Sequence, residues 1–162
     1  PSAKHFLQHS RLVGRYRKHA KEICTVFMHV RHSKGYWDGQ QPFISSKNLS
    51  PDNPMIAVIT RATIRWSKMA TFWRSVPAVQ EDILNQPGLI FTKGIGEVPF
   101  RQMATFSLWQ NERFLKDFAY RQKPHQKVIR QTRMLQWYEE ELFAHFQPYE
   151  SWGTWHGKHL VP

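Results

Sequence analysis

The stretch MIAVITRATIR, residues 55–65, constrains the fold more than any other part of the sequence. Its β-branched and apolar residues predict a strand, in which side chains alternate between two faces. One face carries Ile56, Val58, Thr60, Ala62 and Ile64, and the other carries Ala57, Ile59, Arg61, Thr63 and Arg65. The apolar face has to be covered by helices, so the second face, with its arginines, points towards a facing sheet or a cavity.

The residues after this strand predict a helix and then a hairpin. Ser67 can cap a helix whose apolar stripe runs from Met69 to Ile83, and Pro77 should kink or break it. The turn residues QPG, 86–88, end the helix. LIFTKGIGEVP (89–99) and RQMATFSLW (101–109) then predict two strands joined by a short turn.

A second helix and a last strand complete the pattern. Asn111 is a good cap for a helix that places Phe114, Leu115 and Phe118 together. Pro124 fits the first position of a new helical segment, which we expect to run to about Phe146, with the acids of residues 139–141 on a solvated face. A strand follows within QPYESWGTWHG, residues 147–157. This βαββαβ order predicts an α+β, ferredoxin-like repeat with an antiparallel sheet.

The first third of the chain predicts the tail of an earlier, similar repeat. Residues 6–23 predict a basic helix, residues 25–31 predict a strand, and residues 33–54 are rich in proline, glycine and small polar residues. GYWDG (35–39) matches GTWHG (153–157), and each follows a helix and a strand. We therefore expect an incomplete repeat at 1–43, a linker at 44–54 and a complete repeat at 55–162.

Charge and cysteine content narrow the classes of function. The net charge is +11, and residues 1–37 hold eight Lys and Arg residues against one acid, Glu22. Such a basic end is either a solvated helix face or a surface that attracts phosphates or anionic lipids. Cys24 is the single cysteine, which excludes an internal disulfide and a thiolate metal cluster. No apolar run approaches the ~20 residues that cross a bilayer, and the start at Pro1 looks like a cut end that a preceding segment would extend.

Several long motifs, in order along the chain, resemble the spheroidene monooxygenase family of carotenoid-modifying enzymes. They are IAVITRATIR, FWRSVP, PGLIFTKGIGEVP, TFSLW, FAYR, WYEEELFAHF and GTWHG. The match continues upstream through GRYRKHAKEICTVFMHVRHSKGYWDGQQPF. The chain therefore resembles the C-terminal part of a family member.

The resemblance implies two ferredoxin-like halves of the dimeric α/β barrel type, of which this chain carries one complete half. We expect it to pair with another copy or with a missing first half. The implied reaction adds an oxo group to a linear carotenoid with O₂, and haem is the implied cofactor. Activation of O₂ requires a metal, a flavin or a radical, and GIGEVP is too short for a dinucleotide-binding turn.

His125 is the predicted haem ligand. At the second position of a helix the macrodipole disfavours an imidazolium, and the neutral imidazole is the form that binds iron. The alternative is a histidine packed against the sheet and bonded to backbone; His29, His145 and His156 are weaker candidates. A buried arginine requires a carboxylate, which a haem propionate would supply. The arginines predicted to bind haem are Arg61, Arg65, Arg101 and Arg121. No catalytic residue is assigned.

Three other functions remain open at this point. The chain could be a non-catalytic homologue, a binding or assembly subunit of a pigment-containing membrane complex. It could be a cofactor-free or flavin-assisted oxygenase on the same fold. Nucleic-acid binding is disfavoured because the strands lack an aromatic RNA-stacking motif. In the leading hypothesis the protein is cytoplasmic and peripheral to a membrane, held by its basic N-terminal helix.

Overall fold

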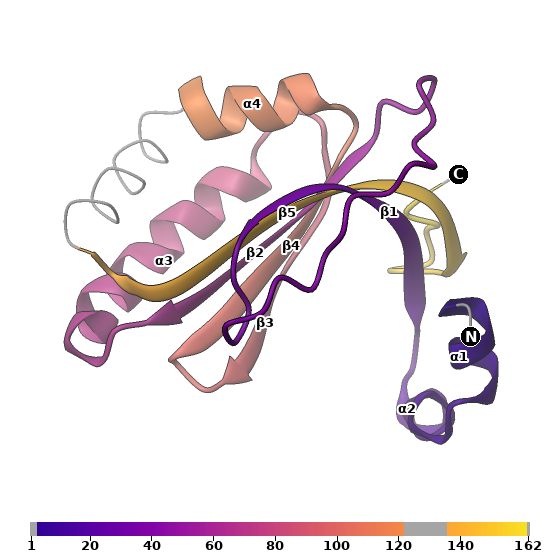
Figure 1. Ribbon diagram of the computed structural model, residues 1–162, viewed down its shortest axis with the longest axis horizontal. Coiled ribbons are helices and arrows are strands. Elements are labelled where there is room, and N and C mark those ends of the chain that lie inside the picture. Colours follow the sequence, from indigo (N-terminus) through magenta and orange to yellow (C-terminus); the bar gives the residue numbers. More distant parts are fainter. Residues whose placement is uncertain (1–2, 122–135, 162) are drawn as a thin grey trace. The chain divides into compact units, whose positions relative to one another are not determined.

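The computed structural model describes residues 3–121 and 136–161 (Figure 1). The chain forms two compact units, one of Pro1–Phe27 with Tyr149–Pro162 and one of Met28–Pro148. The larger unit contains the βαββαβ repeat that the sequence predicts. Its elements are β2 (Ile56–Ile64), α3 (Met69–Leu84), β3 (Leu89–Val98), β4 (Gln102–Trp109), α4 (Glu112–Arg121) and β5 (Tyr138–Gly153).

The sheet has the strand order β1-β5-β2-β4-β3, where β1 is Cys24–Gly35. Strand β2 pairs antiparallel with both β4 and β5, and β3 pairs antiparallel with β4. Helices α3 and α4 lie on the same face of the sheet (Figure 1). The predicted α+β, ferredoxin-like class is therefore confirmed.

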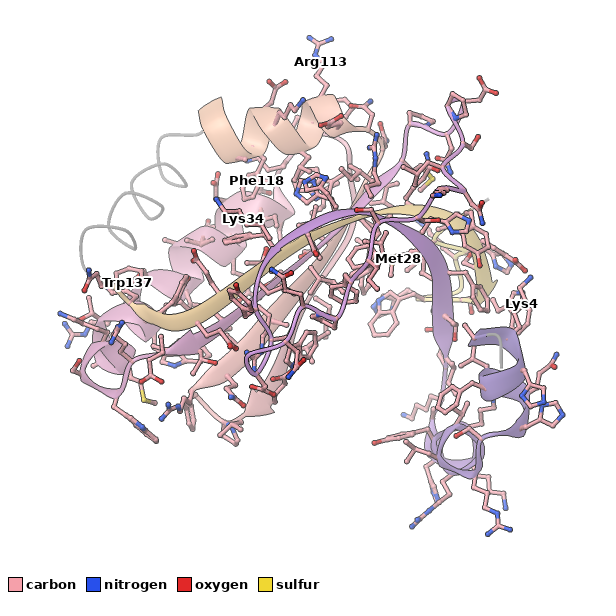
Figure 2. The ribbon with its side chains drawn as sticks, viewed as in Figure 1. Lys4, Met28, Lys34, Arg113, Phe118 and Trp137 are labelled. Carbon is pink, nitrogen blue, oxygen red and sulfur yellow. The ribbon has the colours of Figure 1, made fainter. Side chains whose placement is uncertain are left out.

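Strand β2 is buried on both faces, because the helices cover one face and the segment between β1 and β2 covers the other. On the helix side, Ile56 and Val58 pack with Trp109 and Phe118, which comes from α4 (Figure 2). Ile64 packs with Phe72 of α3 and with Trp137. On the opposite face Phe43, in the segment between β1 and β2, contacts Phe146 of β5 at 5.0 Å between ring centroids. The predicted division of β2 into two faces is confirmed.

The first helix of the repeat differs from the prediction at two residues. Pro77 lies inside α3, which continues unbroken from Met69 to Leu84, so the expected break is wrong. Ser67 lies within a short 3₁₀ turn, η1 (Trp66–Lys68), and makes no cap; Lys68 occupies the N-cap position instead. The predicted cap of α4 is correct, since Asn111 Oδ1 accepts hydrogen bonds from the backbone N–H groups of Arg113 and Phe114.

The expected helix from Pro124 to Phe146 is wrong in its second part. Strand β5 already begins at Tyr138, and residues 122–135 lie outside the described part of the chain. From Leu142 to Phe146 burial alternates, with Leu142, Ala144 and Phe146 buried and Phe143 exposed. An alternation of period two is the signature of a strand, and it outweighs the helical spacing that also fits these residues.

The N-terminal unit contains two helices where the sequence predicted one. Helix α1 (Ala3–His9) is separated from α2 (Arg11–His19) by Ser10, whose side chain accepts a hydrogen bond from Val13 N. A serine at this position caps a new helix instead of continuing the old one. Strand β1 extends to Gly35, four residues beyond the predicted end.

The two GxWxG motifs have the same local structure. Trp37 pairs with Gln40 and Trp155 pairs with Lys158, so each motif ends in a two-residue turn. The turn residues Asp38 and Gly39 have φ of 50° and 71°, and His156 and Gly157 have φ of 51° and 72°. Positive φ at both central residues defines a type I′ turn. The internal echo in the sequence therefore corresponds to two equivalent turns.

A carboxylate holds each of these turns. Glu140 accepts hydrogen bonds from the N–H groups of Asp38 and Gly39, both at 2.8 Å. Glu22 accepts from those of His156 at 2.8 Å and Gly157 at 2.9 Å. Hydrogen bonds that favour the charged carboxylate lower its pKa. Gly39 is the main cause of the lowered pKa of Glu140, and the Thr154 hydroxyl is the main cause for Glu22.

Candidate functional site

Arg61 forms the most extensive charged network among the described residues. It lies on the face of β2 that points away from the helices, and its side chain is 0% exposed. The guanidinium donates to Asp38 at 2.8 Å, to Glu97 at 3.1 Å and 3.2 Å, and to Glu140. Its carbon lies 5.3 Å from the centroid of the Trp37 ring. The network joins β2, β3, β5 and the turn that follows β1.

The acids compensate the cost of burying this arginine. Burial alone would lower the pKa of Arg61, but the hydrogen bonds and charges of Glu97 and Asp38 raise it above its ordinary value. The sequence predicted that a buried arginine here requires a carboxylate, and the protein itself supplies three. A haem propionate at Arg61 would have to displace one of them.

Arg65 and Arg101 lie at one end of β2 and also have protein partners. Arg65 Nε donates to the backbone oxygen of Tyr138 at 3.1 Å. Arg101 donates to Glu139 at 2.6 Å and lies over the Trp66 ring, 4.9 Å from its centroid. Their partners differ from those of Arg61, so the structure does not bring the three arginines to one ligand. His125 and the side chain of Arg121 lie outside the described residues.

Two apolar clusters lie on the helix-side face of the sheet, and neither includes the residues at its centre. One cluster surrounds Ile56 and Trp109, and the other surrounds Ile64 and Trp137. Between them, Thr60 of β2 is opposite Thr105 of β4 and Phe143 of β5. Thr60 and Thr105 are half-buried, and Phe143 is 39% exposed. We name Thr60, Thr105, Phe143 and His145 the central band.

His145 is the polar residue of the central band with the most perturbed environment. Its Nδ1 atom is buried and has no hydrogen-bond partner among the described residues. Its ring lies 4.3 Å from that of His32, measured between centroids. Burial, followed by the charge of His32, lowers the pKa of His145 to about 4. The imidazole is therefore neutral at physiological pH, which is the state that binds metals or accepts protons.

A polar hollow lies near this histidine pair in the larger unit. It has a volume of about 520 Å³ and is lined by Arg31, Glu112, Arg113 and Gln147, together with residues of the segment before β2. Gln147 already bonds to the backbone of Ser50 and Asn53. The hollow is open and three charged side chains, Arg31, Glu112 and Arg113, contribute to its lining, so it does not suit a long apolar substrate.

Sequence reasoning missed most of the residues that define these sites. Glu140 and His145 were assigned to a helix, where they could not face Arg61 and His32. Asp38 and Glu97 lie in a turn and a strand whose proximity to Arg61 depends on strand order. The sequence held no clear signal for this strand, because LFAHF (142–146) is apolar at 142, 143, 144 and 146 and does not alternate; the period-two burial appears only in the structure.

The chain is similar in sequence to three proteins named spheroidene monooxygenase. That of Cereibacter sphaeroides is 37% identical over 161 residues, which are 99% of this chain and 49% of the relative. That of Rhodobacter capsulatus is 37% identical over 146 residues, 89% of this chain and 60% of the relative. That of Rubrivivax gelatinosus is 33% identical over 157 residues, which are 97% of this chain and 59% of the relative. The chain thus spans about half to 60% of their length.

Solved structures agree on the fold, and no family model matches the chain. A protein of Fusobacterium nucleatum, provisionally assigned as a monooxygenase, has a TM-score of 0.56 at 12% identity and covers 91% of this chain and 64% of its own. A conserved protein of Methanosarcina mazei has a TM-score of 0.52 at 14% identity and covers 60% of this chain and 95% of its own. No helix in the described residues has the length and apolar character needed to cross a membrane. By its sequence the chain matches a part of the proteins named spheroidene monooxygenase.

Proposed function

We propose that this chain is part of an O₂-dependent monooxygenase that oxygenates a linear carotenoid, with haem as the group that activates oxygen. The observation that carries the proposal is the 37% identity to a spheroidene monooxygenase over 99% of the chain. A spheroidene-like polyene is a long apolar molecule, and apolar ligands bind in sites lined mainly by apolar and aromatic side chains. The central band, with Phe143 between two apolar clusters, is the part of the described sheet that suits such a ligand.

Three of the four arginines expected to hold the haem propionates already have partners within the protein. The guanidiniums of Arg61 and Arg101 are engaged by carboxylates, and Arg65 bonds to a backbone oxygen. His125, the proposed ligand, lies outside the described residues. We therefore derive no reaction step through haem. We propose that the central band is this chain's own contribution to the polyene site, with His145 held neutral because burial and the charge of His32 lower its pKa to about 4.

The absorption spectrum of the purified chain tests the haem proposal. We expect a Soret band when the protein is produced with haem, and we expect the His125→Ala variant to lose or shift that band. His19→Ala is the matched control, because His19 is exposed in the last turn of α2, and we expect it to leave the band unchanged. Identical spectra for the wild type and His125→Ala would show that His125 is not the ligand.

Product formation tests the reaction itself. Incubation with a linear carotenoid, O₂ and a reductant should give an oxo-carotenoid, detected by mass spectrometry. The pairing of Arg61 and Arg101 with the protein's own acids favours a second candidate, a non-catalytic binding or assembly subunit of a pigment-containing complex. That candidate predicts a protein that binds carotenoid without a Soret band and forms no product even when the remainder of a family member is added. Product formation in the absence of haem would instead favour the flavin-assisted or cofactor-free alternative.

A further inference from the structure

Two adjacent turns expose large apolar side chains at one end of the sheet. Trp66, in η1 after β2, is 66% exposed, and Phe100, in the turn between β3 and β4, is 65% exposed. Val98 next to Phe100 is also exposed. The two turns lie at the same end of the sheet (Figure 1), and Arg101 connects them because it follows Phe100 and lies over Trp66. We name Trp66, Val98 and Phe100 the turn surface.

The backbone holds these side chains outwards. Phe100 has φ of 65°, a conformation that is costly for a bulky residue and that persists only where the surroundings impose it. Trp73 Nε1 donates to the Phe100 backbone oxygen at 2.9 Å, and Ile64 N donates to that of Arg101 at 2.8 Å. The Trp73 and Phe100 rings are in contact, with 5.8 Å between centroids. Exposed aromatic residues in an ordered and strained turn indicate a binding role rather than a loosely packed tip.

Two cations are close in sequence to residues of the turn surface or to Trp73, whose ring contacts Phe100. Lys68 ends η1 and Arg74 lies in the second turn of α3. Neither forms an ion pair with any residue that the structure describes. Glu139 is paired with Arg101, so this acid does not neutralise the two free cations. Tryptophan and phenylalanine flanked by lysine and arginine is the composition of surfaces that enter the interface of an anionic bilayer.

We propose that the turn surface docks on an anionic lipid bilayer, with Trp66 and Phe100 entering the headgroup region and Lys68 and Arg74 pairing with lipid phosphates. The proposal is based on the composition of the surface and not on the carotenoid reaction, so the two proposals can fail separately. It also competes with the N-terminal helices α1 and α2, which the sequence suggested as the membrane-binding element. Helix α2 is basic and exposes Leu12 and Tyr16.

Co-sedimentation of the full chain with vesicles tests the proposal. We expect binding to phosphatidylcholine vesicles that contain phosphatidylglycerol, and weaker binding to pure phosphatidylcholine. Trp66→Ser combined with Phe100→Asn should lower the partition coefficient at least about tenfold, because two aromatic rings no longer leave water. Asparagine tolerates positive φ, so this replacement does not add strain at position 100. Lys68→Gln and Arg74→Gln should each lower binding to the anionic vesicles roughly fivefold and leave binding to neutral vesicles unchanged.

Two control variants separate this surface from the alternatives. Ile44→Ser changes a highly exposed apolar residue in the segment before β2 and should leave partitioning unchanged. Leu12→Ser with Tyr16→Ser should have little effect. If that pair abolishes binding while the Trp66 and Phe100 pair does not, the N-terminal helices bind the bilayer and the proposal is wrong. The proposal is also wrong if the wild-type chain does not bind anionic vesicles at low salt. It is wrong as well if the variant with Trp66→Ser and Phe100→Asn keeps its vesicle binding and loses only self-association.

Discussion

Arg61 shows how one buried charge can organise several strands. Its guanidinium is out of contact with solvent, yet it bonds to acids that are 23, 36 and 79 residues away in the sequence. These acids keep part of their surface in water. The network therefore connects β2 to β3, to β5 and to the first GxWxG turn, and its loss would destabilise each of these elements.

We expect Arg61→Met to lower the free energy of unfolding by about 2–4 kcal/mol, because it leaves three acids without their common cation. Arg61→Lys keeps the charge but loses the forked geometry and should cost about 1–2 kcal/mol. Urea unfolding measures both. Arg113→Met is the matched control, since Arg113 is exposed and its pair with Asp117 is long, at 3.9 Å. If Arg61→Met and Arg113→Met lower the free energy of unfolding equally, the Arg61 network adds nothing to stability. If Arg61→Met loses bound haem but keeps its stability, the result favours a contact between Arg61 and a haem propionate.

His145 couples the stability of the larger unit to pH. It faces His32, and the charges of Glu112, Arg31 and Lys116 also act on it; only Glu112 favours protonation. Because its pKa is about 4 in the folded protein and near 6.5 when unfolded, the unfolded chain binds more protons between these values. Stability contributed by the neutral ring is thus complete above about pH 6.5 and is lost as the pH falls towards about 4.

The expected loss from this histidine is about 2 kcal/mol between about pH 7 and about pH 5. Urea unfolding of the wild type and of His145→Leu at both pH values measures it, since the variant lacks the titrating group. The wild type should lose free energy of unfolding between the two pH values that the variant does not lose. Its advantage in stability over His145→Leu should therefore shrink or reverse at the lower pH. A pH-independent difference would mean that the ring is not desolvated as the structure shows.

At the level of elements, the two GxWxG turns depend on glycine at the residue where each strand ends. Gly35 and Gly153 have φ of 94° and 77°, and an added Cβ would lie 2.1 Å from Glu141 O and 2.0 Å from Ile23 O, respectively. Both the backbone conformation and the close approach therefore require glycine. Asparagine tolerates the positive φ, but its Cβ would still clash with the backbone oxygen.

Gly153→Ala and Gly35→Ala should each destabilise the protein by roughly 2–4 kcal/mol, through strain at positive φ and the clash with a backbone oxygen. Gly14→Ala is the contrasting change, because Gly14 is in α2 and nothing lies within 4 Å of its added Cβ. It should stabilise α2 by about 0.5–1 kcal/mol. Thermal unfolding monitored by circular dichroism measures all three. A neutral Gly153→Ala would contradict the close approach to Ile23.

The elements also show where sequence patterns are ambiguous. MIAVITRATIR could be assigned correctly because its alternation is long and rich in β-branched residues. WYEEELFAHF has apolar residues at spacings that fit a helix as well as a strand, and three consecutive glutamates favour a helix. Pairing of β5 with β2 decides the matter, because eight residues of β5 form a register with β2. This tertiary contact overrides local propensity.

At the scale of the whole molecule, the family match and the fold agree with what the ordered motifs predicted. The chain matches spheroidene monooxygenases over nearly all of its own length but only about half to 60% of theirs. The equivalence of the two turns is consistent with a repeated architecture, while the division into an incomplete repeat, a linker and a complete repeat stays a prediction. Pairing with another copy or with a first half also stays a prediction, as do haem binding and the role of His125.

The sequence by itself determined the βαββαβ order, the helix side of β2, the cap at Asn111 and the match to spheroidene monooxygenases, because each depends on patterns among residues close together in the chain or on long ordered motifs. Only the tertiary structure decided which groups meet: the three acids at Arg61, the His32–His145 contact, and the aromatic residues of the turn surface. These contacts join residues that are far apart in sequence. They depend on strand order and register, which no local spacing specifies.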